Sequence, residues 1–264
     1  MDQRAGAEHY AEIAAAYDGH WVYGAEYVPW MSARIAEALD LSATDRIADI
    51  GGGTGLFARE VARIVRPERP ILCVDPSEAM LRQIPAPDRS GSPLSESLTP
   101  VLASAEDIAD ARTVLPYPEL DAVWLKESVH HVTDPGATLR GLAQRLAPQG
   151  RLLVVMLPAT IQYPLFRAAL DRFEELQPDP ADIEAHLERA GLRTRLFHVE
   201  HELRIDRAKY LAMVRGRYMS LLSTFDDREI EEGIEEIRAT HPEPVLVFPD
   251  RFAFVLGVRE GGTR

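Results

Sequence analysis

The chain has 264 residues, of which 46% are hydrophobic, enough for one large domain or two ordinary domains around a substantial core. Its 29 lysines and arginines against 42 aspartates and glutamates give a net charge of −13, which argues against nucleic acid as a partner. The single cysteine, Cys73, cannot form an internal disulfide. No signal segment or membrane-length apolar stretch is present, so we expect a cytoplasmic protein that does not bind membranes.

Strands and helices alternate from about residue 46. The hydrophobic pattern predicts strands at 46–50, 71–75, 99–103, 120–125 and 151–156, and helices at about 55–65, from Ser77, and at 135–146. Further helices are expected at 161–176, 180–190 and within 206–240, with strands near 195–205 and 245–260. The alternation predicts an α/β fold: a doubly wound, mostly parallel seven-stranded sheet with helices on both faces.

Glycines concentrate in DIGGGTG at 49–55, between an expected strand and an expected helix. Gly51, Gly53 and Gly55 permit positive φ and bring backbone N–H groups close to a ligand at a helix N-terminus. The dinucleotide fingerprint requires Gly or Ala at its sixth position, where this chain has Leu56. The spacing therefore disfavours nicotinamide cofactors.

Asp75 ends the second expected strand. A carboxylate there can accept both hydrogen bonds of a ribose diol. The alternative is a turn aspartate before Pro76, although Ser77 already provides a helix cap.

Five stretches resemble the class I S-adenosylmethionine-dependent methyltransferases of the bacterial small-molecule group: DIGGGTG (49–55), CVDPSEAML (73–81), ASAEDIA (103–109), LDAVWLKESVHHVTDP (120–135) and GRLLVVMLP (150–158). The resemblance implies S-adenosylmethionine as cofactor and S-adenosylhomocysteine as product. The cofactor-binding residues that it implies are Tyr17, Asp49, Gly51, Gly53, Gly55, Asp75, Pro76, Ser104, Ala105, Glu106 and Lys126. Many relatives have Asp where this chain has Ser104, whose hydroxyl can still accept a bond from the adenine amino group.

The resemblance also implies a division of the chain into three parts. Residues 1–41 would form N-terminal lid helices, with Tyr17 over the cofactor and Trp21 near the substrate, although packing onto the domain explains Tyr17 equally well. The cofactor-binding sheet domain is expected to comprise 42–160, 178–205 and 242–264. A helical cap, expected at 161–177 and 206–241, would bind the acceptor.

The segment from Lys126 to His131 follows a strand, at the edge where doubly wound folds bind ligands. His130 and His131 are candidates for a catalytic base, because an imidazole titrates near pH 6.5, and either one alone can meet the substrate. Lys126 is a cofactor-edge residue through its backbone, or a solvated charge. No metal is expected, because neighbouring histidines without cysteines do not match the usual ligand spacing.

The expected cap contains a local basic concentration between Asp206 and Thr224. On a helix, Arg217 falls on one stripe with Tyr210 and Val214, which makes it a candidate clamp for an anionic acceptor. The alternative is a salt bridge to an acid of the sheet domain or a snorkelling stem. Tyr218 is a further substrate-binding candidate that packing explains as well.

We therefore expect a methyltransferase acting on a small-molecule acceptor, first at oxygen and with an anionic group under the cap. Nitrogen and carbon acceptors remain open, as does a non-transfer reaction such as cyclisation that uses the bound cofactor. The sequence does not determine the oligomeric state.

Overall fold

The computed structural model describes residues 26–85 and 97–261, and they fall into two compact units. Unit 1 contains the described residues up to 156 together with 180–197 and 253–261, and unit 2 contains 157–179 and 198–252. Unit 2 is wider than the predicted cap because it takes in the far ends of the two long C-terminal strands.

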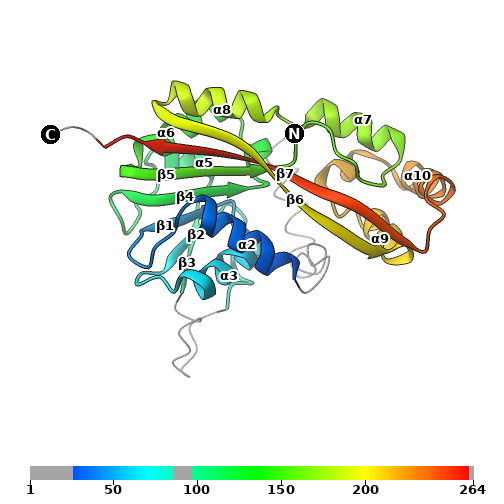
Figure 1. Ribbon diagram of the computed structural model, residues 1–264, viewed down its shortest axis with the longest axis horizontal. Helices are drawn as coiled ribbons and strands as arrows, with labels where there is room; N and C mark the ends of the chain where they lie inside the picture. The colour runs from blue at the N-terminus through cyan, green and yellow to red at the C-terminus, as the bar shows by residue number, and fades with distance from the viewer. Residues whose placement is uncertain (1–25, 86–96, 262–264) are drawn as a thin grey trace. The chain divides into compact units, whose positions relative to one another are not determined.

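Unit 1 is built on a seven-stranded sheet in the order β3-β2-β1-β4-β5-β7-β6 (Figure 1). Strands β1 to β5 are parallel to one another, and β7 runs antiparallel to β5. This confirms the predicted fold class. The strands are β1 (Ile47–Ile50), β2 (Ile71–Asp75), β3 (Leu98–Leu102), β4 (Leu120–Lys126), β5 (Leu146–Met156), β6 (Leu192–Asp206) and β7 (Val245–Arg259).

Helices of unit 1 pack on the sheet because its central strands are apolar on both faces. Every residue of β1 and β2 is buried, as expected for interior parallel strands. Alternate strand residues such as Ile50 and Val74 share one cluster with helix residues such as Leu139 and Ile183. The helices among the described residues of unit 1 are α2 (Tyr27–Ala38), α3 (Leu56–Val65), α4 (Glu78–Leu81), α5 (Ala105–Ala109), the short 3-10 helix η1 (Val129–His131), α6 (Pro135–Gln144) and α8 (Pro180–Arg189).

Two helix starts follow from local sequence. The Ser77 side chain accepts a bond from the Met80 amide at the start of α4, as predicted. The Asp134 side chain caps α6, and Pro135 occupies the first helical turn, where its missing N–H removes no intrahelical bond.

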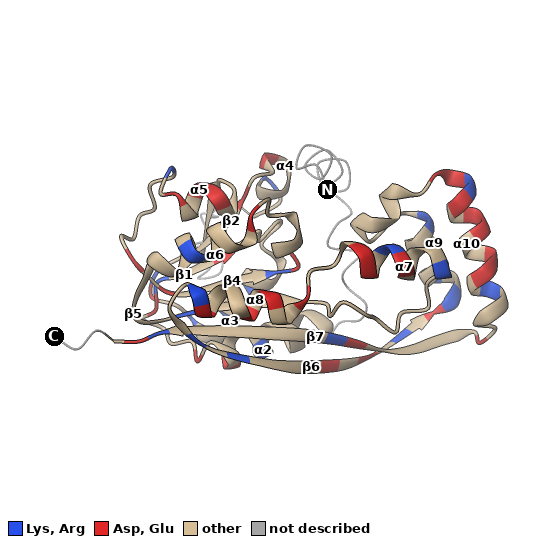
Figure 2. Cartoon of the chain, turned by 90° about the horizontal axis from the view of Figure 1, so that it is seen from above, with Lys and Arg blue, Asp and Glu red and all other residues tan. Residues whose placement is uncertain are grey.

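Unit 2 contains α7 (Arg167–Leu176), α9 (Arg207–Arg215), the short 3-10 helix η2 (Ser220–Thr224) and α10 (Asp227–Thr240). Much of the α10 ribbon is red for Asp and Glu in Figure 2. Its residues Ile230, Ile234 and Ile237 are buried, so α10 is an amphipathic helix within the segment 206–240, where the sequence predicts helices.

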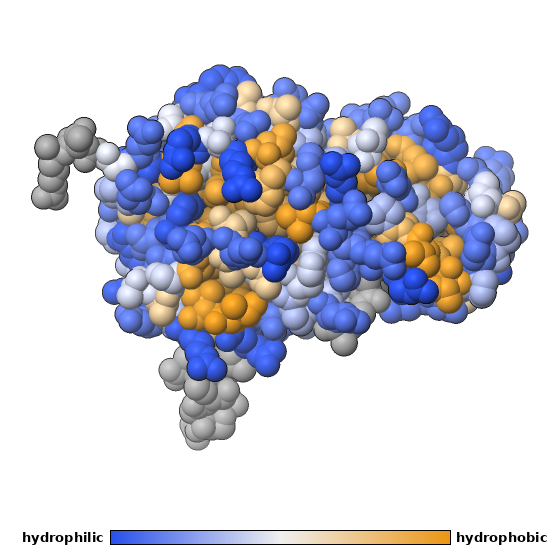
Figure 3. Space-filling model, viewed as in Figure 1, coloured by the Kyte–Doolittle hydropathy of each residue, from blue (hydrophilic) through white to orange (hydrophobic). Residues whose placement is uncertain are grey.

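The described surface is mixed. On the face drawn in Figure 3, apolar areas are separated by hydrophilic side chains. No helix within 26–85 or 97–261 combines the length and the apolar character needed to cross a membrane.

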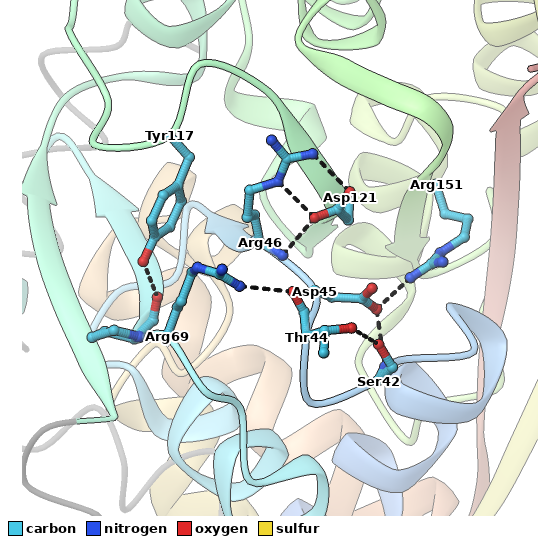
Figure 4. A network of polar contacts seen from close by, with 9 residues as sticks. Ser42, Thr44, Asp45, Arg46, Arg69, Tyr117, Asp121 and Arg151 are labelled. Carbon is cyan, nitrogen blue, oxygen red and sulfur yellow. Dashed lines mark hydrogen bonds and ion pairs between the residues drawn. The ribbon is translucent and has the colours of Figure 1, made fainter.

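A polar network holds the amino ends of the central strands (Figure 4). Arg46, just before β1, donates from Nε and a terminal nitrogen to the two carboxylate oxygens of Asp121, at 2.7 and 2.9 Å. The backbone N–H of Arg46 donates to the same carboxylate at 2.8 Å. Arg151 of β5 pairs with Asp45, and Arg69 donates to the Thr44 carbonyl. The charged groups at this edge therefore join β1 to β4 and β5.

We expect Asp121→Asn to cost about 1–2 kcal/mol in the free energy of unfolding at pH 7, because it removes a bidentate, mostly shielded ion pair. The bond from Arg46 lowers the pKa of Asp121, so this contribution is present above the carboxyl group's ordinary pKa and is lost as pH falls. Urea titrations at pH 7 and pH 3 measure it. Glu78→Gln, in an exposed pair with Arg82, is the control and should change stability little; equal losses in both variants would contradict the assignment.

Candidate functional site

The glycine loop after β1 is tied to the end of β2 through its backbone. The N–H groups of Gly51 and Gly52 both donate to the Val74 carbonyl, at 2.8 and 3.0 Å, and the N–H of Gly55 donates to the Gly52 carbonyl at 2.9 Å. This corrects the expectation that the loop's N–H groups face a ligand. The amides of Gly51, Gly52 and Gly55 are engaged inside the protein, so they are not free to donate to a ligand.

Asp75 links the two loops directly. Its Oδ2 accepts a bond from the N–H of Gly53 at 2.9 Å, and its Oδ1 accepts one from the N–H of Ser77 at 2.8 Å. Asp75 is therefore both a turn residue, the alternative reading, and a buried carboxylate at the ligand edge. Each of its oxygens keeps a further lone pair, so the predicted bonds to a ribose diol remain compatible with this geometry.

A second contact brings the segment after β4 against the glycine loop. Gly51 has φ +76°, and a Cβ added there would lie 2.4 Å from Cβ of Ser128. The Ser128 hydroxyl donates to the Ile50 carbonyl at 3.0 Å. Glycine is thus required at 51 both for its conformation and for this close approach.

Asp49 gives the site its electrostatic character. It lies at the end of β1, is 3% exposed, and pairs in register with Cys73 of β2. Burial, followed by the nearby Asp75 carboxyl group, raises the pKa of Asp49 to about 8, while the Lys126 ammonium lowers it. Burial also raises the pKa of Asp75. Two buried acids beside engaged amides favour a cationic ligand group and disfavour a phosphate.

The segment from Lys126 to His131 combines backbone strain with buried polar atoms. Glu127 has φ +50° and donates its N–H to the Val155 carbonyl at 2.8 Å. The Lys126 Nζ lies 4.5 Å from the centre of the Phe57 ring, so this side chain covers α3. A non-glycine residue at positive φ beside a ligand edge is typical of functional sites.

His130 is the most unusual side chain of this segment. Its Nδ1 is buried and has no hydrogen-bond partner among the residues that the structure describes. Its ring centre lies 4.1 Å from that of His131. Burial, then the neighbouring His131 and Lys126, lowers the pKa of His130 well below its usual value, so the ring is neutral at pH 7.

The Ser104 region has a structural role that the sequence reading missed. The Ser104 hydroxyl accepts from the Asp107 amide at 3.1 Å, and the Asp107 carboxylate accepts from the Ser104 amide at 3.0 Å, a capping box for α5. The spacing Ser-x-x-Asp carries this signal. Ala105 begins α5, and Glu106 accepts a bond from the Thr133 amide at 3.2 Å. The adenine contacts of Ser104, Ala105 and Glu106 remain predictions.

Three other predicted site residues gain little from the structure. Tyr17 and Trp21 lie outside the described residues, so their lid and substrate roles stay predictions. Pro76 is exposed just after Asp75, where a cofactor contact is compatible with its position.

The predicted helical stripe through Arg217 is wrong. Helix α9 ends at Arg215, and Arg217 follows with φ +53°, which no helix interior accommodates. Its guanidinium bonds to Asp227 at 2.8 Å and to the Phe225 carbonyl at 3.2 Å. Arg215 pairs with Glu231 in the same way. Acids of α10 thus pair with Arg215 and Arg217, and the salt bridge of Arg217 is made within unit 2, not to the sheet domain as the alternative had it.

Tyr218 lies in the core of unit 2, which favours the packing alternative. It is 3% exposed, and its hydroxyl pairs with that of Tyr210 at 3.1 Å. Burial raises the pKa of Tyr218. No group of three His, Cys, Asp or Glu side chains within the described ranges is arranged to hold a metal ion.

Comparison with known proteins finds a family model that matches the central part of the chain. A family model described as a methyltransferase domain matches residues 48–154, which run from β1 into β5 and include both acids of the site and the 126–131 segment. This match agrees with the resemblance of the sequence to the class I S-adenosylmethionine-dependent methyltransferases. S-adenosylmethionine, the cofactor of class I methyltransferases, carries a sulfonium and an ammonium group, and both suit the acidic edge described above.

Curated relatives with similar sequences include C-methyltransferases. The chain is 30% identical over 155 residues to the ubiquinone/menaquinone biosynthesis C-methyltransferase UbiE of Pseudomonas putida, covering 56% of each protein. It spans about half the length of the curated relatives it matches.

Two solved structures show the same fold. A putative methyltransferase from an antibiotic biosynthesis pathway of Anabaena variabilis has a TM-score of 0.65 at 17% identity, covering 86% of this chain and 96% of that one. The [4+2]-cyclase SpnF has a TM-score of 0.57 at 18% identity, covering 90% and 82%.

Asp75→Ala is expected to weaken S-adenosylmethionine binding by about 1.5–3 kcal/mol, the size of charge-assisted hydrogen bonds. Isothermal titration calorimetry measures this loss. Because Asp75 also holds the Gly53 amide, Asp75→Asn serves as the companion variant that keeps one acceptor oxygen. Unchanged affinity in a folded Asp75→Ala protein would remove Asp75 from the cofactor site.

Cofactor binding at pH 7 is expected to release protons from Asp49. With a pKa of about 8, this carboxyl group is about nine-tenths protonated at pH 7, and a cationic ligand favours its ionised form. Affinity should therefore rise as pH increases through 8. Calorimetry in buffers of different ionisation enthalpy counts the protons, and Asp49→Asn removes the contribution of this group. Equal proton release in both proteins would show that Asp49 does not titrate on binding.

Proposed function

We propose that this protein transfers the methyl group of S-adenosylmethionine to a small acceptor that carries an acidic O–H group, with His130 as the base. The observation that supports it is the meeting of three elements at one sheet edge. Ser128 bonds to the carbonyl before the glycine loop, Asp75 bonds to that loop, and His130 lies two residues beyond Ser128.

The bound cofactor would supply an electrophilic methyl group on a positively charged sulfur. The protein must then hold a nucleophile in line with that methyl and remove any proton that hinders attack. A neutral imidazole with an unsatisfied buried nitrogen is suited to the second task, because an acceptor hydroxyl that donates to Nδ1 would satisfy it.

Oxygen and carbon acceptors are both consistent with this chemistry. Removal of the proton from a phenol or enol gives an anion that is nucleophilic at oxygen and at the carbon next to the one that bears this oxygen. The relative named above is a C-methyltransferase, which supports a carbon acceptor as the second candidate. His130 would remove the acceptor proton in either case, and the alignment of the acceptor would select whether oxygen or carbon is methylated.

Incubation with S-adenosylmethionine and a panel of phenols, enols, amines and carboxylic acids tests the proposal, with S-adenosylhomocysteine and methylated product both quantified. We expect stoichiometric amounts of the two from an O–H acceptor. Product formation without S-adenosylhomocysteine would instead indicate a non-transfer reaction, the alternative class. Turnover of amines alone would exclude the proposed acceptor class.

His130→Ala is expected to lower kcat by about 10²–10⁴-fold at nearly constant cofactor Kd, the usual contribution of a positioned base. Because the pKa of His130 is lowered, the wild-type rate should stay on a plateau through neutral pH and fall only well below pH 6.5. His131→Ala is the matched control. A fully active His130→Ala protein beside an inactive His131→Ala protein would transfer the role to His131.

A further inference from the structure

A cavity of about 300 Å³ lies wholly within unit 2, lined by the loop after β5 and by β6 and β7. This volume is at the lower end of small-molecule sites. Pro158, Ile161, Pro249 and the ring of Tyr163 give it apolar walls. Its polar lining includes His198, Glu200 and Arg251.

Arg251 differs from the other arginines of unit 2, all of whose residues the structure describes. Each of the others bonds to a carboxylate or to backbone carbonyls: Arg167, Arg172, Arg204, Arg207, Arg215, Arg217, Arg228 and Arg238. Arg251 has no bond or ion pair with any described residue, and it lines the cavity. Arg251 is exposed to solvent, so in an acidic protein its guanidinium is accessible to an external anion that enters the cavity.

The neighbours of Arg251 favour the same ligand. His198 lies close enough for Arg251 to contribute to the lowered pKa of its imidazole, after burial, so a neutral ring offers one N–H to the ligand. Behind the wall, the Tyr163 hydroxyl donates to the fully buried Asp250, which fixes the Tyr163 ring as a flat apolar surface. Glu200 is the only acid of the cavity lining.

We propose that this cavity binds a small organic anion, with Arg251 and His198 holding its carboxylate or phosphate group and the Tyr163 ring contacting its apolar body. The anion is either part of the methyl acceptor or a separate effector. Its assignment to the acceptor rests on the proposed function, whereas the existence of the site does not.

Benzoate and phenyl phosphate are suitable probes, and benzamide is the neutral counterpart of benzoate. Titration of the full-length protein, followed by NMR shifts of the His198 imidazole, should give a Kd of about millimolar for the two anions and no comparable binding of benzamide. Arg251→Gln should weaken anion binding at least about tenfold. The affinity of Arg251→Lys should lie between those of the wild type and Arg251→Gln, because lysine keeps the charge but lacks the paired N–H donors of the guanidinium.

Two control variants make the test specific. Arg204→Gln removes a positive charge from β6 outside the cavity, and its benzoate affinity should equal that of the wild type. Glu200→Gln removes the acid from the cavity, and its affinity should rise. The site would be overturned if benzamide bound as tightly as benzoate, or if Arg251→Gln and Arg204→Gln lost equal benzoate affinity. Absence of anion binding at about 20 mM would overturn it as well.

Activity measurements separate this inference from the proposed function and identify the source of the anion. A raised acceptor KM in Arg251→Gln at constant kcat assigns the anion to the acceptor. A benzoate effect on kcat without competition against the acceptor assigns it to a separate effector. Both outcomes support the site. Anion binding without any methyl transfer would overturn the proposed function alone. Methyl transfer without anion binding would overturn this inference alone.

Discussion

The carboxylate of Asp75 connects the two loops on which the site depends. By accepting from Gly53 after β1 and from Ser77 after β2, it fixes the ends of two neighbouring strands with buried, charge-assisted bonds. Ser128 makes the matching connection from the end of β4. The carboxyl edge of the sheet is thus held by three short contacts, while the ion pairs of Arg46 and Arg151 hold the opposite edge. This separation leaves the carboxyl edge available for a ligand.

The direction of the loop's hydrogen bonds determines which ligand charge suits it. In phosphate-binding glycine loops the amides point outward. Here the amides of Gly51, Gly52 and Gly53 point inward, and the buried acids Asp49 and Asp75 lie beside them. A cationic cofactor favours the ionised form of these buried acids, whereas a dinucleotide phosphate disfavours it. The preference for S-adenosylmethionine therefore follows from electrostatics as well as from the absence of a third fingerprint glycine.

Much of the sheet domain could be predicted, because burial on both faces leaves a clear hydrophobic pattern in the sequence. Strand β2 was predicted at its observed bounds, and Ser77 was identified as a cap. Hydrophobic patterns do not report hydrogen-bond partners, so the inward amides and the capping box at Ser104 were not foreseen. Arg217 shows the same limit: a helical reading placed it on a stripe, whereas the turn after α9 directs it to Asp227. The unpaired Arg251 could not be found either, because pairing depends on tertiary neighbours.

A crystal structure of the protein with S-adenosylhomocysteine tests the central claim most directly. The account predicts that both ribose hydroxyls donate to Asp75 while its bonds to Gly53 and Ser77 are kept, and that the ligand's ammonium group faces the carbonyl oxygens of the glycine loop and the Asp49 carboxylate. A ligand bound elsewhere, or one whose ribose makes no contact with Asp75, would contradict it.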